Sequence, residues 1–187
     1  MNNFNNPNSR MKSMASKVEI RISCKNLPSF DALSKSDPKI FIFLEKQIYS
    51  GHDVTSTWEL IDSTERIKNC DCPVFTKPFL IDYYFETIQK LRFVVFDMDS
   101  DSNEWSKNDY IGFTEKSLGD LISSSKDHVY TCNLSKDVPS GLKISNSKAK
   151  SFSGNSQIFI RIEEVINSPY NFNFDVTGTN LDKMVKK

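Results

Sequence analysis

The sequence has no surplus of charge of either sign, no long apolar run and no apolar leader, and each absence excludes a class of protein. Lysine and arginine number 24, as do aspartate and glutamate, so the basic excess of a general nucleic-acid binder is missing. The sequence contains no run of 18 apolar residues, which a transmembrane helix would need. The N-terminal residues lack the core of a secretory signal, and Asn2 replaces the glycine that N-myristoylation requires. We therefore expect a cytoplasmic protein that contacts membranes only peripherally.

Motifs for catalysis are also missing. The chain has only two histidines, His52 and His128, and no nucleophile elbow, glycine-rich phosphate loop or HExxH. We therefore expect that the chain is not an enzyme. The four cysteines, expected as free thiols in a reducing compartment, are Cys24, Cys70, Cys72 and Cys132. Cys70-Asp71-Cys72 suggests a zinc site, but the other cysteines and the histidines are not at ligand spacing, which disfavours it.

The patterns that are present are those of β-strands. Residues 18–24 (VEIRISC) alternate apolar and polar with period two, and residues 39–44 (KIFIFL) are rich in β-branched and aromatic side chains. Further strands are predicted at residues 58–63, 79–84, 91–97, 110–115 and 157–163. Two helical segments are predicted: a single turn at residues 86–90 and a short helix at residues 117–123. Short strands with turns between them and little helix favour an all-β, antiparallel sandwich.

Five aspartates stand where predicted strands meet loops. Asp31 and Asp37 follow the first strand, Asp97 and Asp99 end a very apolar one, and Asp109 opens the next. Loops at one end of a sandwich converge, so these carboxylates can share one site. Hard cations such as Ca²⁺ take six to eight oxygen ligands, and without a cation the carboxylates would repel one another. The sequence therefore predicts a calcium site at one tip of the sandwich.

An EF-hand is the obvious rival for the same aspartates. Asp97, Asp99 and Asp101 match loop positions 1, 3 and 5. Ser102 replaces the glycine of position 6, and Asn108 replaces the glutamate of position 12. The preceding segment reads as a strand rather than a helix, so the EF-hand fails on three counts.

Taken in order, the loop motifs resemble those of a C2 domain. The matching residues are Leu27, Asp31, Ser36-Asp37-Pro38, Asn69, Pro73-Val74-Phe75, Asp97, Asp99 and Asp109-Tyr110-Ile111-Gly112. Within that family the chain is most similar to the first C2 domain of copines, on residues 18–27, 31–38 and 77–93. The resemblance covers residues 17–166 and implies an eight-stranded sandwich. Residues 1–16 are expected to be a disordered tail.

The last residues, 167–187, form a tail that resembles the opening of a second copine C2 domain. Residues 171–176 alternate like a strand, so they are also a candidate eighth strand of the one sandwich. The sequence alone leaves both readings open, together with the question of whether the chain is a fragment or a natural truncation.

The resemblance implies that Asp31, Asp37, Asp97, Asp99 and Asp109 bind two or three Ca²⁺ ions. It further implies main-chain carbonyl ligands at Phe30 and Met98. The third loop is longer than is usual in the family, with an insertion around residues 100–108. Asp101 is therefore a candidate substitute or additional ligand, and the place of Asp109 depends on how this loop folds.

The predicted function is calcium-dependent docking on anionic phospholipid membranes. Five carboxylates carry a charge of about −5, and two or three Ca²⁺ ions would change it to about −1 or +1. Leu33 and Trp105, in the first and third loops, are predicted membrane contacts, and recruitment to the plasma membrane or endomembranes is expected when calcium rises. The alternative is a calcium-insensitive scaffold that binds protein partners. Nucleic acid is not an expected partner.

Overall fold

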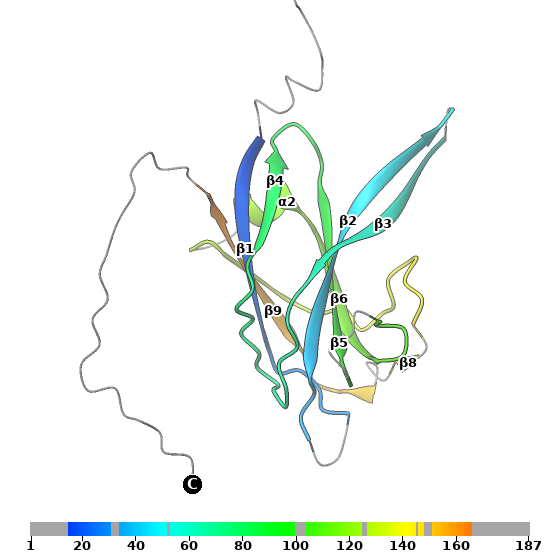
Figure 1. The fold of residues 1–187 in the computed structure, drawn as a ribbon, viewed down its shortest axis with the longest axis vertical. Helices are drawn as coiled ribbons and strands as arrows, with labels where there is room; N and C mark the ends of the chain where they lie inside the picture. The colour runs from blue at the N-terminus through cyan, green and yellow to red at the C-terminus, as the bar shows by residue number, and fades with distance from the viewer. Residues whose placement is uncertain are drawn as a thin grey trace, which may run out of the picture.

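Two β-sheets face one another in this computed structural model, which describes residues 15–30, 34–51, 53–99, 104–124, 127–144, 146–147 and 151–165. The strands are β1 (Ala15–Lys25), β2 (Pro38–Ser50), β3 (Asp53–Ser63), β4 (Phe79–Tyr84), β5 (Lys90–Asp97), β6 (Asp109–Ser117), β7 (Val129–Asn133), β8 (Asn146–Ser147) and β9 (Gln157–Glu164). Helix α2 (Leu118–Ser124) follows β6 directly. Figure 1 shows this arrangement.

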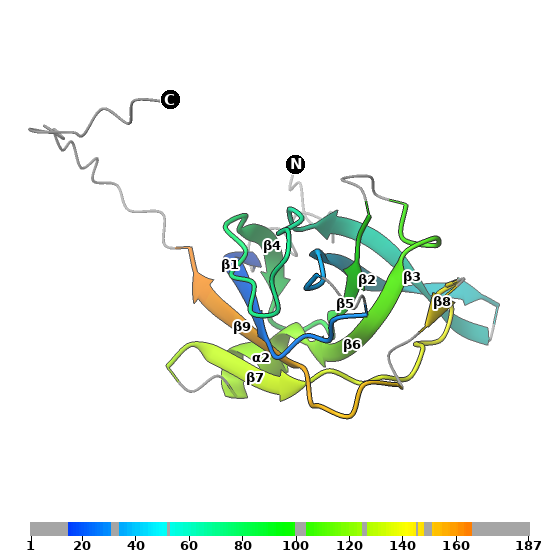
Figure 2. The same cartoon turned by 90° about the horizontal axis from the view of Figure 1, so that it is seen from below.

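One sheet has four strands in the order β4-β1-β9-β7, and the other has five in the order β3-β2-β5-β6-β8. Figure 2 looks onto the end where β5 finishes and β6 begins, and shows the two sheets as separate layers. The pairings are antiparallel, except that the two-residue β8 runs parallel to β6. This topology confirms the predicted all-β sandwich.

The core between the sheets follows from the alternation of side chains along each strand. Val18, Ile20 and Ile22 of β1 point inward and are at most 2% exposed, whereas Arg21 between them is exposed. From the facing sheet, Ile40 and Phe93 are fully buried in the same cluster. The strand pattern predicted from period-two alternation is therefore the pattern of core burial.

The outer face of the five-stranded sheet carries a second apolar cluster. Its buried members are Phe41, Phe43, Val94, Phe96, Met98 and Tyr110. Partly buried side chains such as Trp105 and Leu142, from the loops, pack against them. β2 and β5 are thus covered on both faces, which explains why their sequences read as continuous apolar runs instead of alternating.

Two of the differences from the predicted elements concern β1 and β7. β1 begins at Ala15, since Ala15 and Ser16 pair with Tyr84 and Tyr83, two residues inside the predicted tail. The strand β7 was not predicted. It supplies the eighth antiparallel strand and pairs with β9 from Val129 to Asn133. Residues 171–176, the other candidate for that strand, lie outside the described residues.

The β2–β3 hairpin extends beyond the sandwich as a two-stranded ribbon. β2 pairs with β5 only as far as Leu44, and its residues 45–50 pair with β3 alone. Figure 1 shows the ribbon projecting away from the other strands. Tyr49 at its tip is 71% exposed. In the described ranges no helix is long and apolar enough to cross a membrane.

Candidate metal centre

The predicted ligands Asp37, Asp97 and Asp109 lie at the ends of three neighbouring strands. The antiparallel register places Pro38 opposite Asp97, and Asp97 opposite Asp109. Adjacent strands are about 4.8 Å apart, so residues at these ends are close in space. The pairing continues into the loops, because the N–H of Met98 donates to the carbonyl of Asp37 at 3.0 Å.

Asp97, the last residue of β5, is partly buried. Burial raises its pKa; hydrogen bonds from the N–H of Asp37 and from the Ser36 side chain oppose this change, and the charges of Asp37 and Asp109 add to it. The Asp37 N–H donates to Asp97 Oδ1 at 2.6 Å. The site therefore concentrates negative charge at a place where water solvates it only partly.

Asp99 is exposed, and its main chain is held by the far limb of the third loop. Its N–H donates to Asn108 Oδ1 at 3.0 Å. Asn108 is only 6% exposed, and its Nδ2 donates to the carbonyl of Glu104 at 2.6 Å. The N–H of Asn108 also donates to the carbonyl of Trp105 at 3.0 Å. Asn108 thus links the Asp99 segment to the segment that precedes Asp109.

Arg66 and Asn69, in the connection between β3 and β4, complete the surroundings of Asp37. The N–H of Asn69 donates to Asp37 Oδ1 at 2.7 Å. Nη1 of Arg66 lies 3.6 Å from Asp37 Oδ2 and donates to the carbonyl of Met98 at 3.1 Å. Sequence reasoning missed both Arg66 and Asn108 as site residues. No local motif marks Arg66, which meets Met98 across 32 residues of chain.

The candidate metal-ligand atoms among the described residues suit a hard cation. They are carboxylate oxygens and the Met98 carbonyl, and no histidine or cysteine is among them, which suits Ca²⁺ better than zinc. Burial is the main cause of the raised pKa of Asp97, and the charges of Asp37 and Asp109 add to it. A divalent cation would relieve this repulsion between the carboxylates. Among the described residues, no three histidine, cysteine, aspartate or glutamate side chains are already arranged to hold a metal ion. Asp31, Leu33 and Asp101 lie outside the described residues, so their roles stay predictions, as does the number of ions.

The structure describes all four cysteines and Phe30, which also figured in the sequence predictions. All four cysteines are free thiols, as expected. Asp71, between Cys70 and Cys72, forms an ion pair with Lys35 at 2.9 Å.

Phe30 packs against the inter-sheet core. Its side chain therefore anchors the first loop, in which the main-chain carbonyl of Phe30 is a predicted calcium ligand.

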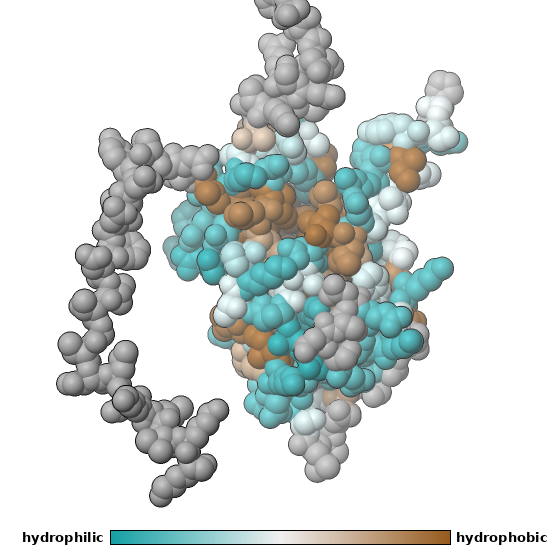
Figure 3. All heavy atoms as spheres, in the orientation of Figure 1, coloured by the Kyte–Doolittle hydropathy of each residue, from teal (hydrophilic) through white to brown (hydrophobic). Residues whose placement is uncertain are grey.

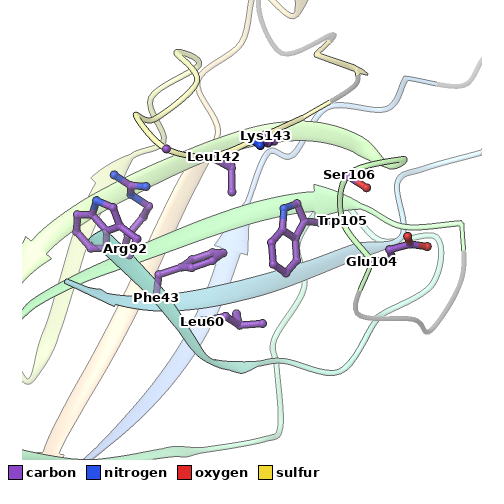
Figure 4. A pocket seen from close by; sticks show the side chains of 10 residues that line it. Phe43, Leu60, Arg92, Glu104, Trp105, Ser106, Leu142 and Lys143 are labelled. Carbon is purple, nitrogen blue, oxygen red and sulfur yellow. The ribbon is translucent and has the colours of Figure 1, made fainter. Parts of the chain in front are cut away.

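Trp105, a predicted membrane contact, is half-buried on the outer face of the five-stranded sheet. Its ring packs edge-on against Phe41 and Phe43, with centroid distances of 5.2 and 5.6 Å. Beside it lies an open cavity of about 420 Å³, lined also by Leu60 and Leu142 (Figure 4). Trp105 therefore anchors the third loop on the sheet, and any insertion into a membrane would first have to break these contacts.

Arg92 forms the far wall of this cavity. Its guanidinium stacks 3.8 Å from the centroid of the Trp58 ring, Nε donates to Glu115 at 2.7 Å, and Nη1 donates to the carbonyl of Ser140 at 2.8 Å. This arginine is almost completely buried. Its contacts tie the 134–144 segment to the sheet.

Comparison with known proteins agrees with this architecture. Residues 16–132 match the C2 domain family, and since this is more than half of the chain, the chain belongs to that family. The chain is 36% identical to Copine-D of Dictyostelium discoideum over 172 residues, which are 90% of this chain and 28% of Copine-D. It is 46% identical to Copine-E of the same organism over 111 residues, or 59% of this chain and 18% of Copine-E. The predicted resemblance to copines is confirmed, and the chain spans less than a third of the length of these relatives.

A solved structure supports the fold alone. BON1-C2B has a TM-score of 0.52 and 24% sequence identity, and the match covers 82% of this chain and 94% of BON1-C2B.

Proposed function

We propose that this C2 domain binds Ca²⁺ through Asp37, Asp97, Asp99 and Asp109, together with Asp31, and thereby docks on anionic phospholipid membranes. The observation that carries the proposal is the convergence of Asp37, Asp97 and Asp109 at three adjacent strand ends. The raised pKa of Asp97 supports it: burial is the main cause and the charges of Asp37 and Asp109 add to it, so the folded protein keeps this carboxylate ionised at a cost in stability. Membership of the C2 family and similarity to copines favour the same function.

The change of charge is the proposed switch. Without Ca²⁺ the five aspartates repel an anionic bilayer with a charge of about −5, and with two or three ions bound the charge becomes about −1 or +1. Bound ions would also offer coordination positions to lipid phosphate oxygens. Leu33 and Trp105 are the proposed apolar contacts, and a fully buried side chain contributes about 2–3 kcal/mol at most. Ca²⁺ and the membrane should therefore bind cooperatively.

Sedimentation with anionic liposomes across a range of Ca²⁺ concentrations tests the proposal. Wild type should pellet with the liposomes only when Ca²⁺ is present, and Asp97→Asn/Asp99→Asn should stay in the supernatant. Asp53→Asn is the matched control. Asp53 is an exposed aspartate at the start of β3, the end of that strand that is remote from the candidate calcium site. Equal binding of all three proteins with and without Ca²⁺ would sink the calcium switch.

Membrane contact by Trp105 needs a separate measurement. In a Trp58→Phe background, lipids brominated along their acyl chains should quench the fluorescence of Trp105 when the protein is bound. If binding is demonstrated and no quenching occurs, Trp105 remains on Phe41 and Phe43 and takes no part in the contact.

A protein-interaction scaffold is the second candidate, and one surface favours it. Phe85 and Ile88, in the β4–β5 connection, are 78% and 77% exposed, and Leu80 of β4 is 60% exposed. Figure 3 shows apolar surface over the β4 region, far from the end that carries the aspartates. Exposed apolar patches often mark sites of protein association. Calcium titration calorimetry separates the candidates, since a scaffold that ignores calcium gives no heat at millimolar Ca²⁺.

A further inference from the structure

We infer that Arg66 is a resident counter-cation of the acidic site: it holds Asp37 and Met98 in the calcium-free protein and competes with Ca²⁺ for them. The inference rests on the proposed function and names the residue that sets its calcium affinity. Nη1 of Arg66 lies 3.6 Å from Asp37 Oδ2 and 3.1 Å from the Met98 carbonyl oxygen. Both oxygens belong to predicted calcium ligands, so one positive group already contacts two of them.

The burial of Arg66 separates this contact from an ordinary surface ion pair. Its side chain is 8% exposed and that of Asp37 is 28% exposed. Lys35 and Asp71, in the same group of loops, also pair, but their side chains are 52% and 38% exposed. Exposed pairs contribute little because water and salt screen them, whereas a desolvated guanidinium depends on the anions beside it. Arg66 and the aspartates therefore stabilise one another.

The main chain around Arg66 is fixed, so the guanidinium is delivered to the site by the fold. The N–H of Thr64 donates to the carbonyl of Ile40 at 2.9 Å, and the N–H of Ile67 donates to the carbonyl of Pro38 at 3.1 Å. These two hydrogen bonds hold the segment beside the start of β2, the strand that Asp37 precedes. Arg66 consequently keeps its place near the aspartates when a cation arrives.

Competition follows from thermodynamic linkage. Contacts that are stronger in the calcium-free state than in the calcium-bound state lower the calcium affinity by the same free energy. Ca²⁺ at Asp37 and Met98 would weaken the hold of Arg66 on both and would place two cations near each other. Arg66 thus lowers the affinity for Ca²⁺ while making the loaded site one charge more positive toward an anionic membrane.

Calorimetric Ca²⁺ titration of the whole chain, without lipid, tests the inference. Arg66→Gln should bind Ca²⁺ about tenfold more tightly than wild type, because a neutral amide neither repels the ion nor satisfies Asp37 as well. Arg66→Lys keeps the charge but loses the planar fork, and should bind about threefold more tightly. Lys35→Gln removes a nearby exposed charge and is the matched control, with a change below about twofold. Thermal unfolding adds a second readout: Arg66→Gln should melt lower than wild type in EGTA, and Ca²⁺ should raise its midpoint by more.

The outcomes distinguish this inference from the proposed function. If wild type binds Ca²⁺ and Arg66→Gln binds it equally or more weakly, the inference is overturned and the proposed function stands. If only Arg66→Gln binds, the inference stands and wild type is not a calcium sensor; if neither binds, both are overturned. Should Arg66→Gln fail to fold, Arg66→Lys decides, since an unchanged or weaker affinity in that variant overturns the inference.

Discussion

The main-chain N–H of Asp37 donates a 2.6 Å hydrogen bond to Oδ1 of Asp97, across the ends of β2 and β5. Asparagine at position 97 could accept the same hydrogen bond without the charge. Because burial and the charges of Asp37 and Asp109 raise the pKa of Asp97, Asp97→Asn should stabilise the calcium-free protein and should abolish stabilisation by Ca²⁺. Urea unfolding in EGTA and in Ca²⁺ measures both effects, with Asp53→Asn as control. Lower stability of Asp97→Asn in EGTA would show that the carboxylate is favourable where it lies.

Asn108 holds the third loop from within, because its side chain accepts from Asp99 and donates to Glu104. Asn108→Ala leaves the Asp99 N–H and the Glu104 carbonyl without these partners, which should cost about 1–3 kcal/mol of folding stability. Asp99 would also lose its fixed position, so we expect calcium affinity to fall about tenfold. Urea unfolding and calcium calorimetry check the two effects. An unchanged calcium affinity would mean that Asp99 does not depend on Asn108.

Trp105 contributes packing to the outer apolar cluster. Trp105→Ala removes its contacts with Phe41 and Phe43 and should destabilise the fold by about 2 kcal/mol, less than a fully buried tryptophan because it is half-buried. Trp105→Phe keeps part of the contact and should lose less than half of that. Chemical denaturation in EGTA provides the measurement. A loss below about 0.5 kcal/mol would place Trp105 among ordinary surface positions.

Glu65 provides a pH-dependent term. Desolvation tends to raise its pKa, but hydrogen bonds from the N–H and hydroxyl of Thr76 and the N–H of Lys77 outweigh it, so the pKa lies below its ordinary value of 4.5. A depressed folded-state pKa contributes stability above pH 4.5, and this is lost as the pH falls through the lower folded value. Glu65→Gln should therefore cost about 1 kcal/mol at pH 7 and progressively less below pH 4.5.

Unfolding of wild type and Glu65→Gln across pH 3–7 follows this difference. A constant difference over the whole range would assign the effect to packing rather than to the ionised carboxylate.

The sequence predicted those strands that have one solvent-exposed face and one buried face, such as β1, because their apolar and polar residues alternate. It also predicted β2 and β5, although their unbroken apolar character has a cause invisible in the pattern: Trp105 and Leu142 arrive from remote loops to cover the outer face. β7 was missed because a half-exposed edge strand of five residues, VYTCN, needs few apolar side chains.

Within the candidate site, the placing of Asp37, Asp97 and Asp109 at neighbouring strand ends was predictable, because each stands in a local motif beside a strand. Arg66 was not, because its role comes entirely from contacts with residues 29 and 32 positions away. Trp105 was predicted to be a membrane contact, because it lies within the third loop. Its packing on Phe41 and Phe43 is a property of the folded outer cluster alone.

The two halves of β2 should differ in local stability. Residues 40–44 are hydrogen-bonded on both sides, by β5 and, from Phe41, by β3, whereas residues 45–50 pair with β3 alone. Amide hydrogen exchange reports such differences as local opening free energies. In one continuous strand, the amides up to Leu44 should exchange only when the domain opens globally, and those beyond it through fraying of the ribbon. β2 therefore spans two units of different local stability: its first half belongs to the cooperative folding unit, and its second half opens independently with the ribbon.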